Sequence, residues 1–340
     1  MPERRTYSLT WVILCAAGLL AVAFAVAVWV VQEQYSKRGR EVDPAAWGSD
    51  HVGQELPEYV TGEQCLFCHR EKIGPGWAKN RHNLTIRDAE ASSPALEALR
   101  ASPAKSLAEE IKYVMGNKHV HRFLKPSQDY GHLEMLSVHW IPPSRDPPRN
   151  LYHVEQPHWD GKQFASSCAG CHTTAVDSKT QAFSSLSIDC YACHGNVAVE
   201  HPNKPELAHL SSKRKDSAAV ITSICAQCHI RTGQSKSTGL PYPNTFVAGD
   251  NLFRDFKADF SDAAIRSLYS SDRHVMVNVR DVVMNGKESM TCLSCHDVHG
   301  QSSEKHQLLP RSEYCANCHN PKGSMTYVKP LHSNNKTCGY

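Results

Sequence analysis

The sequence predicts a mainly α-helical fold with many loops, a small β-hairpin insert and one N-terminal transmembrane helix. Three observations support this: an uncharged segment near the N-terminus, six copies of a short cysteine motif, and one region rich in β-branched and aromatic residues. The chain has 340 residues, of which 21% are charged, and a formal net charge of +3. Because no strong basic field results, nucleic acid is not an expected partner.

The N-terminal segment is long enough to cross a bilayer. Residues 9–31 carry no charge and follow Arg4 and Arg5. A bilayer span needs about 20 apolar residues, whereas the apolar part of a secretory signal has about 7–15. We therefore expect a cytoplasmic tail over 1–8, a retained transmembrane anchor over 9–31 and a periplasmic tether over 32–60. Cleavage of the segment stays open as the alternative.

Twelve of the 14 cysteines form six copies of Cys-x-x-Cys-His. The cysteine pairs are Cys65 and Cys68, Cys168 and Cys171, Cys190 and Cys193, Cys225 and Cys228, Cys292 and Cys295, and Cys315 and Cys318. The histidines that follow them are His69, His172, His194, His229, His296 and His319. This motif is typical of c-type haem attachment, with two thioether bonds to the porphyrin and the histidine as proximal iron ligand. Zinc knuckles would require six coincidental histidines, so the sequence predicts six covalently bound haem c groups.

Haem attachment also predicts where the chain works. In bacteria, c-type haem is attached outside the inner membrane, so the long C-terminal part should be periplasmic. We expect a hexahaem domain over 61–340 in a single-pass protein of the bacterial inner membrane. Short helices should carry the motifs, and the porphyrins should supply much of the apolar core. Two close motif spacings, 172–194 and 296–319, predict stacked haem pairs.

The long gap between the first two motifs predicts the β-hairpin insert, at about 110–145. Residues 112–116, 120–124 and 133–141 are apolar, aromatic or β-branched runs separated by turn residues, which is typical of short antiparallel strands. Residues 93–101 and 103–111 favour helices. In the second of these, Ser106 followed by Glu109 predicts a capping box.

The motifs and their surroundings resemble those of multihaem c-type cytochromes related to the tetrahaem electron acceptor of hydroxylamine oxidoreductase. That group shares motif spacing with pentahaem nitrite reductases. The matching residues are Trp77 and His82 after the first motif, Tyr113-Val-Met-Gly, Arg122-Phe123-Leu124, His139-Trp140, Cys168-Ala-Gly-Cys-His-Thr-Thr, Cys193-His194-Gly195 with His201, and Cys292-Leu-Ser-Cys-His-Asp-Val-His299-Gly300. The resemblance covers about 62–335. The chain departs from it in having no Cys-x-x-Cys-Lys site, which the usual nitrite-reductase haem requires.

The sixth coordination position of each iron needs its own assignment. The resemblance implies that His82, His201 and His299 are distal ligands, His299 to a neighbouring haem. Further candidate distal ligands are His332, His274, His158, His121 and His119. His119, His121, Arg122, His132 and His139 gather on the hairpin. One histidine of this group, His121 or His119 first, can supply a distal ligand. Otherwise the group can line an open iron position or contact haem propionates. His51, His153 and His209 fit structural roles better.

These features predict a membrane-anchored electron relay rather than an enzyme, because two histidines on an iron leave no position for a substrate. Expected partners are redox proteins, among them a respiratory or photosynthetic membrane complex. One alternative is an oxidoreductase that reduces a small nitrogen or sulfur compound at a five-coordinate haem. A second is a quinol-linked or scaffolding cytochrome subunit of a membrane complex.

Overall fold

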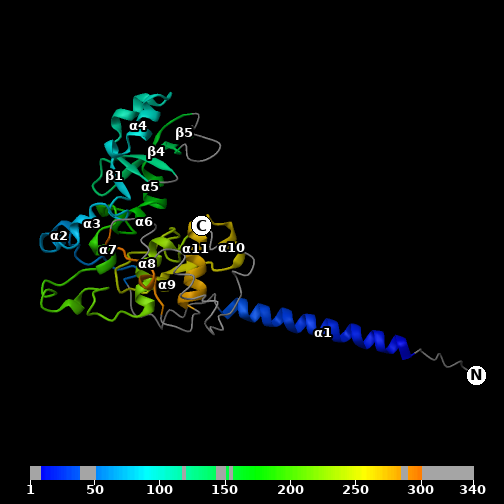
Figure 1. Cartoon of the computed structure of the whole chain (residues 1–340). Coiled ribbons are helices and arrows are strands. Elements are labelled where there is room, and N and C mark those ends of the chain that lie inside the picture. Colours follow the sequence, from blue (N-terminus) through cyan, green and yellow to red (C-terminus); the bar gives the residue numbers. More distant parts are fainter. Residues whose placement is uncertain are drawn as a thin grey trace, which may run out of the picture.

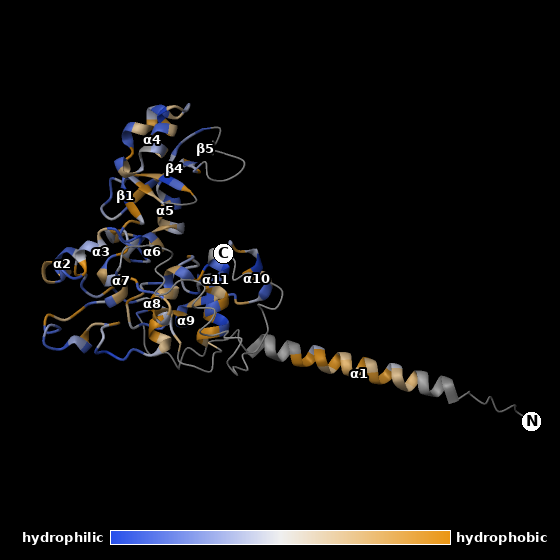
Figure 2. Cartoon of the chain, viewed as in Figure 1, coloured by the Kyte–Doolittle hydropathy of each residue, from blue (hydrophilic) through white to orange (hydrophobic). Residues whose placement is uncertain are grey.

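The computed structural model describes residues 9–38, 51–116, 120–142, 151–152, 156–284 and 290–300. Helix α1 (Leu9–Arg38) projects from the rest of the chain (Figure 1). Its described residues are largely hydrophobic (Figure 2). Their side chains are exposed, with Leu19, Leu20 and Phe24 each 72% exposed. Among the described residues, no helix meets the length and apolarity required of a membrane span. The anchor over 9–31 therefore stays a prediction.

An antiparallel sheet of six strands forms the upper part of Figure 1. The strands are β1 (Ile86–Asp88), β2 (Tyr113–Met115), β3 (His121–Pro126), β4 (Leu133–Trp140), β5 (Leu151–Tyr152) and β6 (Trp159–Asp160). The first five pair in sequence order, and β6 pairs with β4. The three strands predicted from the sequence are confirmed as β2, β3 and β4. The sheet is larger than a hairpin insert, because β1, β5 and β6 pair with them from outside 110–145.

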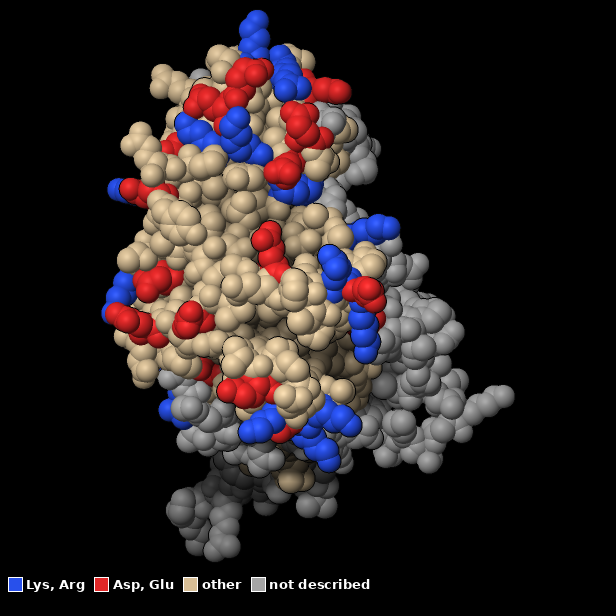
Figure 3. Space-filling model, turned by 90° about the vertical axis from the view of Figure 1, so that its left-hand side faces the viewer, with Lys and Arg blue, Asp and Glu red and all other residues tan. Residues whose placement is uncertain are grey.

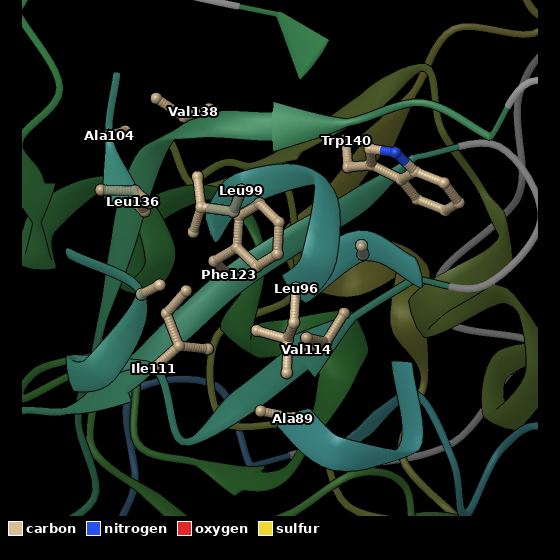
Figure 4. Close-up of a cluster of buried hydrophobic side chains, with 12 residues drawn as sticks. Ala89, Leu96, Leu99, Ala104, Ile111, Val114, Phe123, Leu136, Val138 and Trp140 are labelled. Atoms are coloured by element: carbon tan, nitrogen blue, oxygen red, sulfur yellow. The ribbon is translucent and has the colours of Figure 1, made fainter. Parts of the chain in front are cut away.

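One face of the sheet is covered by short helices. α4 (Ser93–Arg100) lies there with two 3₁₀ turns, η2 (Ala89–Ser92) and η3 (Lys105–Glu110). Leu96 and Leu99 pack with Phe123 and Leu136 in a cluster of buried apolar side chains (Figure 4). The helix predicted at 93–101 is thus confirmed.

The second predicted helix, at 103–111, is instead the 3₁₀ turn η3. It begins after Ala104 without a side-chain cap, so the capping box of Ser106 and Glu109 does not form. Ser102 organises this turn: its hydroxyl donates to the Leu99 carbonyl oxygen at 2.7 Å and accepts from the Ala104 N–H at 3.1 Å. A serine that already bonds to the backbone before the turn replaces the expected cap.

Short helices carry the five described motifs, as predicted. They are α2 (Gly62–His69), α6 (Ala169–His172), α7 (Cys190–His194), α8 (Ala218–His229) and the 3₁₀ turn η6 (Cys292–Ser294). The remaining elements between them are α3 (Gly74–Trp77), α5 (Gly161–Ser167), the hairpin of β7 (Thr173–Val176) and β8 (Phe183–Leu186), η4 (Pro205–Leu207), and the pair β9 (Gly233–Ser235) and β10 (Phe256–Ala258).

A second apolar cluster lies on the C-terminal side of α8. Its elements are α9 (Leu252–Asp255), α10 (Asp262–Ser267), α11 (Ser270–Asn278) and the π-helical turn η5 (Val279–Met284). Phe253, Phe256 and Met276 are buried in it together with Ala226 of α8. The α8 motif therefore packs against a buried apolar cluster, whereas α2 and η6 contain no buried residue.

Candidate haem-binding site

The motif histidines lie at the C-terminal ends of short helices. His69, His172, His194 and His229 are the last residues of α2, α6, α7 and α8. Since residues three and four apart share one face of a helix, each motif gathers its two thiols and its imidazole on one side. That is the arrangement that attachment of a single porphyrin requires.

Capping side chains set where three of these helices begin. The Thr61 hydroxyl accepts from the Gln64 N–H at 3.3 Å at the start of α2, and the Ser217 hydroxyl accepts from the Val220 N–H at 3.3 Å at the start of α8. Asp189 caps α7 by accepting from the Tyr191 N–H at 3.0 Å. Each cap satisfies a backbone donor that the first helical turn leaves unpaired.

Three motif histidines each face a second histidine from a distant part of the chain. The ring centroids are 6.2 Å apart for His69 and His201, 5.8 Å for His194 and His299, and 6.2 Å for His229 and His82. With metal–nitrogen bonds of about 2.0 Å, two imidazoles on one iron have centroids about 6 Å apart. These three pairs therefore have the spacing that an iron between them requires.

The ring planes of these pairs are oriented differently. The rings of His194 and His299 are inclined by 18°, so they are close to parallel. His69 and His201 are inclined by 26°. His229 and His82 stand at 88°, so their planes are perpendicular. Both arrangements are compatible with two axial imidazoles, because each iron–nitrogen bond allows the ring to rotate about it.

Backbone carbonyls orient two of these rings. Nδ1 of His194 lies 2.5 Å from the His209 carbonyl oxygen, and Nδ1 of His201 lies 3.0 Å from the Ala198 carbonyl oxygen. A carbonyl only accepts, so each imidazole donates from Nδ1 and keeps the Nε2 lone pair for a metal. The Asp216 carboxylate in turn accepts from Nδ1 of His209 at 2.9 Å.

The electrostatics of the buried motif histidines favour the neutral form that binds iron. Burial, and then the positive charge of Arg231, lower the pKa of His172 to about 4. Burial is also the main cause that lowers the pKa of His194. Nδ1 of His172 is buried and has no hydrogen-bond partner among the described groups. A buried imidazole that stays neutral keeps a lone pair that can bind a metal.

The described motif residues can be compared with what haem c requires. Among them, no group of three or more His, Cys, Asp or Glu side chains converges closely enough to hold a metal ion. Two thiols and one imidazole per motif, with a second imidazole opposite three of the motif histidines, match haem c. The residues present therefore fit the group that the sequence motif implies.

Asp189 connects two motifs, and sequence reasoning missed it. Besides capping α7, its carboxylate accepts from the Tyr59 hydroxyl and from the Gly62 N–H of α2, the latter at 3.3 Å. Burial is the main cause that raises its pKa. An aspartate directly before a Cys-x-x-Cys motif was a readable helix-cap signal. Its link to α2 could not be read, because the partners lie far apart in the sequence.

Several candidate ligands lie elsewhere or outside the described residues. His274 is exposed on α11, with Nδ1 3.2 Å from the side-chain nitrogen of Asn278. His158 is exposed, with Nδ1 2.9 Å from the Gln156 carbonyl oxygen. His121 is buried on β3 and packs edge-on against Trp140. Candidate ligands and motif residues outside the described part are His119, His332, Cys315, Cys318 and His319.

Two histidines expected to be structural are bound to carboxylates. Nδ1 of His51 lies 2.7 Å from Asp250, and Nδ1 of His209 lies 2.9 Å from Asp216. His209 also supplies the carbonyl that orients His194. The third of that set, His153, falls outside the described residues.

Comparison with known proteins supports a multihaem assignment. No protein-family model matches the chain. It is 28% identical over 196 residues to the multihaem cytochrome MtrA of Shewanella baltica (strain OS185), a match that covers 51% of this chain and 51% of that protein. The chain thus spans about half the length of this relative. The homology supports a multihaem c-type cytochrome with covalently bound haem c, but it does not support the narrower resemblance to partners of hydroxylamine oxidoreductase or to nitrite reductases.

A solved structure gives a weaker match. The undecahaem cytochrome from the S-layer of Carboxydothermus ferrireducens superposes with a TM-score of 0.44 at 17% sequence identity. The match covers 79% of this chain and 44% of that one.

Proposed function

We propose that the chain is a membrane-anchored periplasmic hexahaem c-type cytochrome that relays electrons between a donor and an acceptor protein. The observation that carries this proposal is the set of three histidine pairs, whose ring centroids are 5.8–6.2 Å apart. An iron with imidazoles on both sides has no free position for a substrate. Such a site exchanges electrons without binding a reactant.

The chain's own residues do the following in this proposal. Haem c, when bound, supplies reversible one-electron chemistry at iron. The paired imidazoles would hold each iron from both sides and would exclude water and small ligands from it. The carbonyl oxygens of His209 and Ala198 fix the rings of His194 and His201 through Nδ1. Holding the ligands in one orientation in both oxidation states keeps the rearrangement on electron transfer small.

Membrane anchoring is part of the proposal. Residues 9–31 carry no charge, and the described side chains of α1 are exposed, with Trp29 63% exposed. A continuous run of exposed apolar side chains, as over 15–31, needs an apolar environment. We propose that α1 holds the haem domain at the periplasmic face of the inner membrane, next to a respiratory or photosynthetic complex.

The surface charge gives no reason to propose docking by a large patch of one sign. On the face in Figure 3, Lys and Arg side chains are interspersed with Asp and Glu. The formal charge of the protein part is +3. Six ferric haems with two ionised propionates each would change it to about −3.

Electron paramagnetic resonance of the oxidised protein tests the relay. Parallel imidazole planes act on the same iron d orbital and give a rhombic low-spin signal, whereas perpendicular planes act equally on two orbitals and give a strongly anisotropic one. We expect rhombic signals for the His69–His201 and His194–His299 haems and an anisotropic signal for the His229–His82 haem. A high-spin signal from any of these three would contradict the assignment.

One observation favours the alternative of an oxidoreductase acting on a small nitrogen or sulfur compound. The positive charge of Arg231 acts on the buried ring of His172. A cation beside an iron with an open position would help to bind a small anion there. Carbon monoxide added to the reduced protein distinguishes the two functions. Binding at about one haem, with a matching high-spin ferric signal, would favour the enzyme, and no binding would favour the relay.

A further inference from the structure

The motif on α8 contacts the motif on α7 through a side chain inside the motif itself. Gln227 lies between Cys225 and Cys228. Its side-chain nitrogen donates to the Ala192 carbonyl oxygen of α7 at 3.1 Å and to the Ile224 carbonyl oxygen at 2.9 Å. The bond to Ala192 holds the two motifs side by side.

The same helix contacts the motif on α6. Sγ of Cys228 lies 3.7 Å from the Gly170 carbonyl oxygen, and Sγ of Cys171 lies 3.9 Å from the Gln227 carbonyl oxygen. The thiols of Cys171 and Cys228 also contact each other. Each motif thus touches the other through both a thiol and the backbone.

A third contact joins α8 to η6. Cys225 of α8 and Cys292 of η6 lie near each other and interact electrostatically. The two elements also pack together. In the haem-loaded protein these sulfurs become thioethers on porphyrin edges, so two neighbouring sulfurs bring two porphyrin edges together.

The motif on α2 has a different position. The thiols of Cys65 and Cys190 contact each other, and Asp189 joins the two helices through the Gly62 N–H. This connects α2 to α7. The described contacts therefore form a line from α2 through α7 to α8, and from α8 two further contacts lead to α6 and η6.

We infer that α8 is the branch point of the haem array, where the haem held by Cys225, Cys228 and His229 adjoins the haems on α6, α7 and η6. The haem on α2 is an end of the array, reached through α7. This inference rests on the proposed function, because it takes the motifs as haem sites. The inference adds a route for electrons. An electron that enters at the α2 haem passes through the α7 and α8 haems, and from α8 it can reach either the α6 haem or the η6 haem.

Removing one haem at a time tests the branch point in the full-length protein. We compare Cys225→Ser/Cys228→Ser with Cys65→Ser/Cys68→Ser and follow each remaining haem by paramagnetic resonance during a redox titration. Adjacent haems shift one another's potentials, so loss of the α8 haem should change the potentials of three others. Loss of the α2 haem should change one. The branch point is overturned when the α8 variant changes one haem or none.

A milder variant is needed if the Cys225→Ser/Cys228→Ser protein is not produced in folded, haem-loaded form. Gln227→Leu keeps every cysteine and histidine, and Phe67→Leu is its control at the same position of the α2 motif, where the side chain is 85% exposed. We expect Gln227→Leu to shift the signals of the α7 and α8 haems, and Phe67→Leu to leave all signals unchanged. Identical spectra for Gln227→Leu and the unmodified protein would contradict the contact between α7 and α8.

Haem content separates failure of this inference from failure of the proposed function. It is measured for the unmodified protein as the pyridine haemochrome. A count of six with an unbranched pattern of shifts retains the relay and removes the branch point. A count well below six removes the hexahaem proposal itself.

Discussion

The sheet region and the motif region of this protein are held together in different ways. In β4, Leu133, Met135, Leu136, Val138 and Trp140 are all buried, against apolar clusters on both faces of the sheet. In α2 and η6 no residue is buried, and in α7 the one buried residue is Tyr191. Side-chain packing can stabilise the first region alone. Within the second region, α2, α7 and η6 have few apolar contacts of their own, so their stability must come largely from the groups that their cysteines and histidines bind.

Removal of haem should have the largest effect, because it should destabilise the motif region while leaving the sheet region folded. A chain produced without c-type haem attachment keeps the apolar cluster around Phe123 and Leu136 but loses the ligands that join α2, α6, α7 and α8. We expect amide protons of β3 and β4 to stay protected from exchange, and those of α2 and α7 to exchange quickly. The measurement is hydrogen exchange of the two forms, read by mass spectrometry. Equal protection of both regions in the haem-free chain would show that the motif helices fold without haem.

The same contrast explains what the sequence could predict of the fold. Strand β4 was predictable because apolar and β-branched side chains recur along it between turn residues. β1 and β6 were not, because two or three residues carry no period and become strands only by pairing with β2 and β4. The predicted helix at 103–111 failed because Ser102 had already bonded to the backbone ahead of the expected cap.

For the candidate site, the sequence predicted the attachment residues, and the resemblance implied His82, His201 and His299 as distal ligands, but neither predicted which motif histidine each of these would face. Each Cys-x-x-Cys-His motif is local, so its chemistry can be read from five residues. The facing histidines are not local: His201 meets His69, and His82 meets His229, only through the fold. The roles of Asp189 and of the His209 carbonyl could not be predicted either, because they depend on contacts between segments that are separated in the sequence.

Truncation of Phe123 should have the next largest effect and should be confined to the sheet region. The ring is fully buried between the sheet and α4, so Phe123→Ala leaves a cavity and should lower the free energy of unfolding by about 3–5 kcal/mol. Tyr130→Ala, at a side chain that is 88% exposed, is the control and should change it by less than about 0.5 kcal/mol. Chemical denaturation followed by tryptophan fluorescence measures both. The haem signals of the folded variant should be unchanged, and a shift in them would mean that the two regions are coupled.

The smallest expected effect concerns a polar network within the motif region. Asp216 accepts from Nε of Arg214 at 2.8 Å, from Nδ1 of His209 at 2.9 Å and from the Leu210 N–H at 2.6 Å. Its side chain is 4% exposed. Burial alone would raise the pKa of this carboxyl, but these donors outweigh burial and lower it. The stabilisation is therefore complete above the unfolded pKa of about 4, and it is lost as the pH falls through the lower pKa of the folded state.

Replacing Asp216 by asparagine tests whether this network also orients a haem ligand. Asp216→Asn removes the charge at every pH and should cost about 2 kcal/mol of stability, since bonds to charged groups contribute about 1.5–3 kcal/mol. Asp129→Asn, on an exposed loop, is the control. His209 donates from Nδ1 to Asp216, and its carbonyl oxygen orients the ring of His194. The rhombic signal of the His194–His299 haem should therefore broaden in Asp216→Asn at neutral pH. In the unmodified protein it should broaden only when the pH falls below the lowered pKa of the folded Asp216 carboxyl. A loss of stability with that signal unchanged would limit Asp216 to the fold, and the ring of His194 would then be held by its own ligand bond.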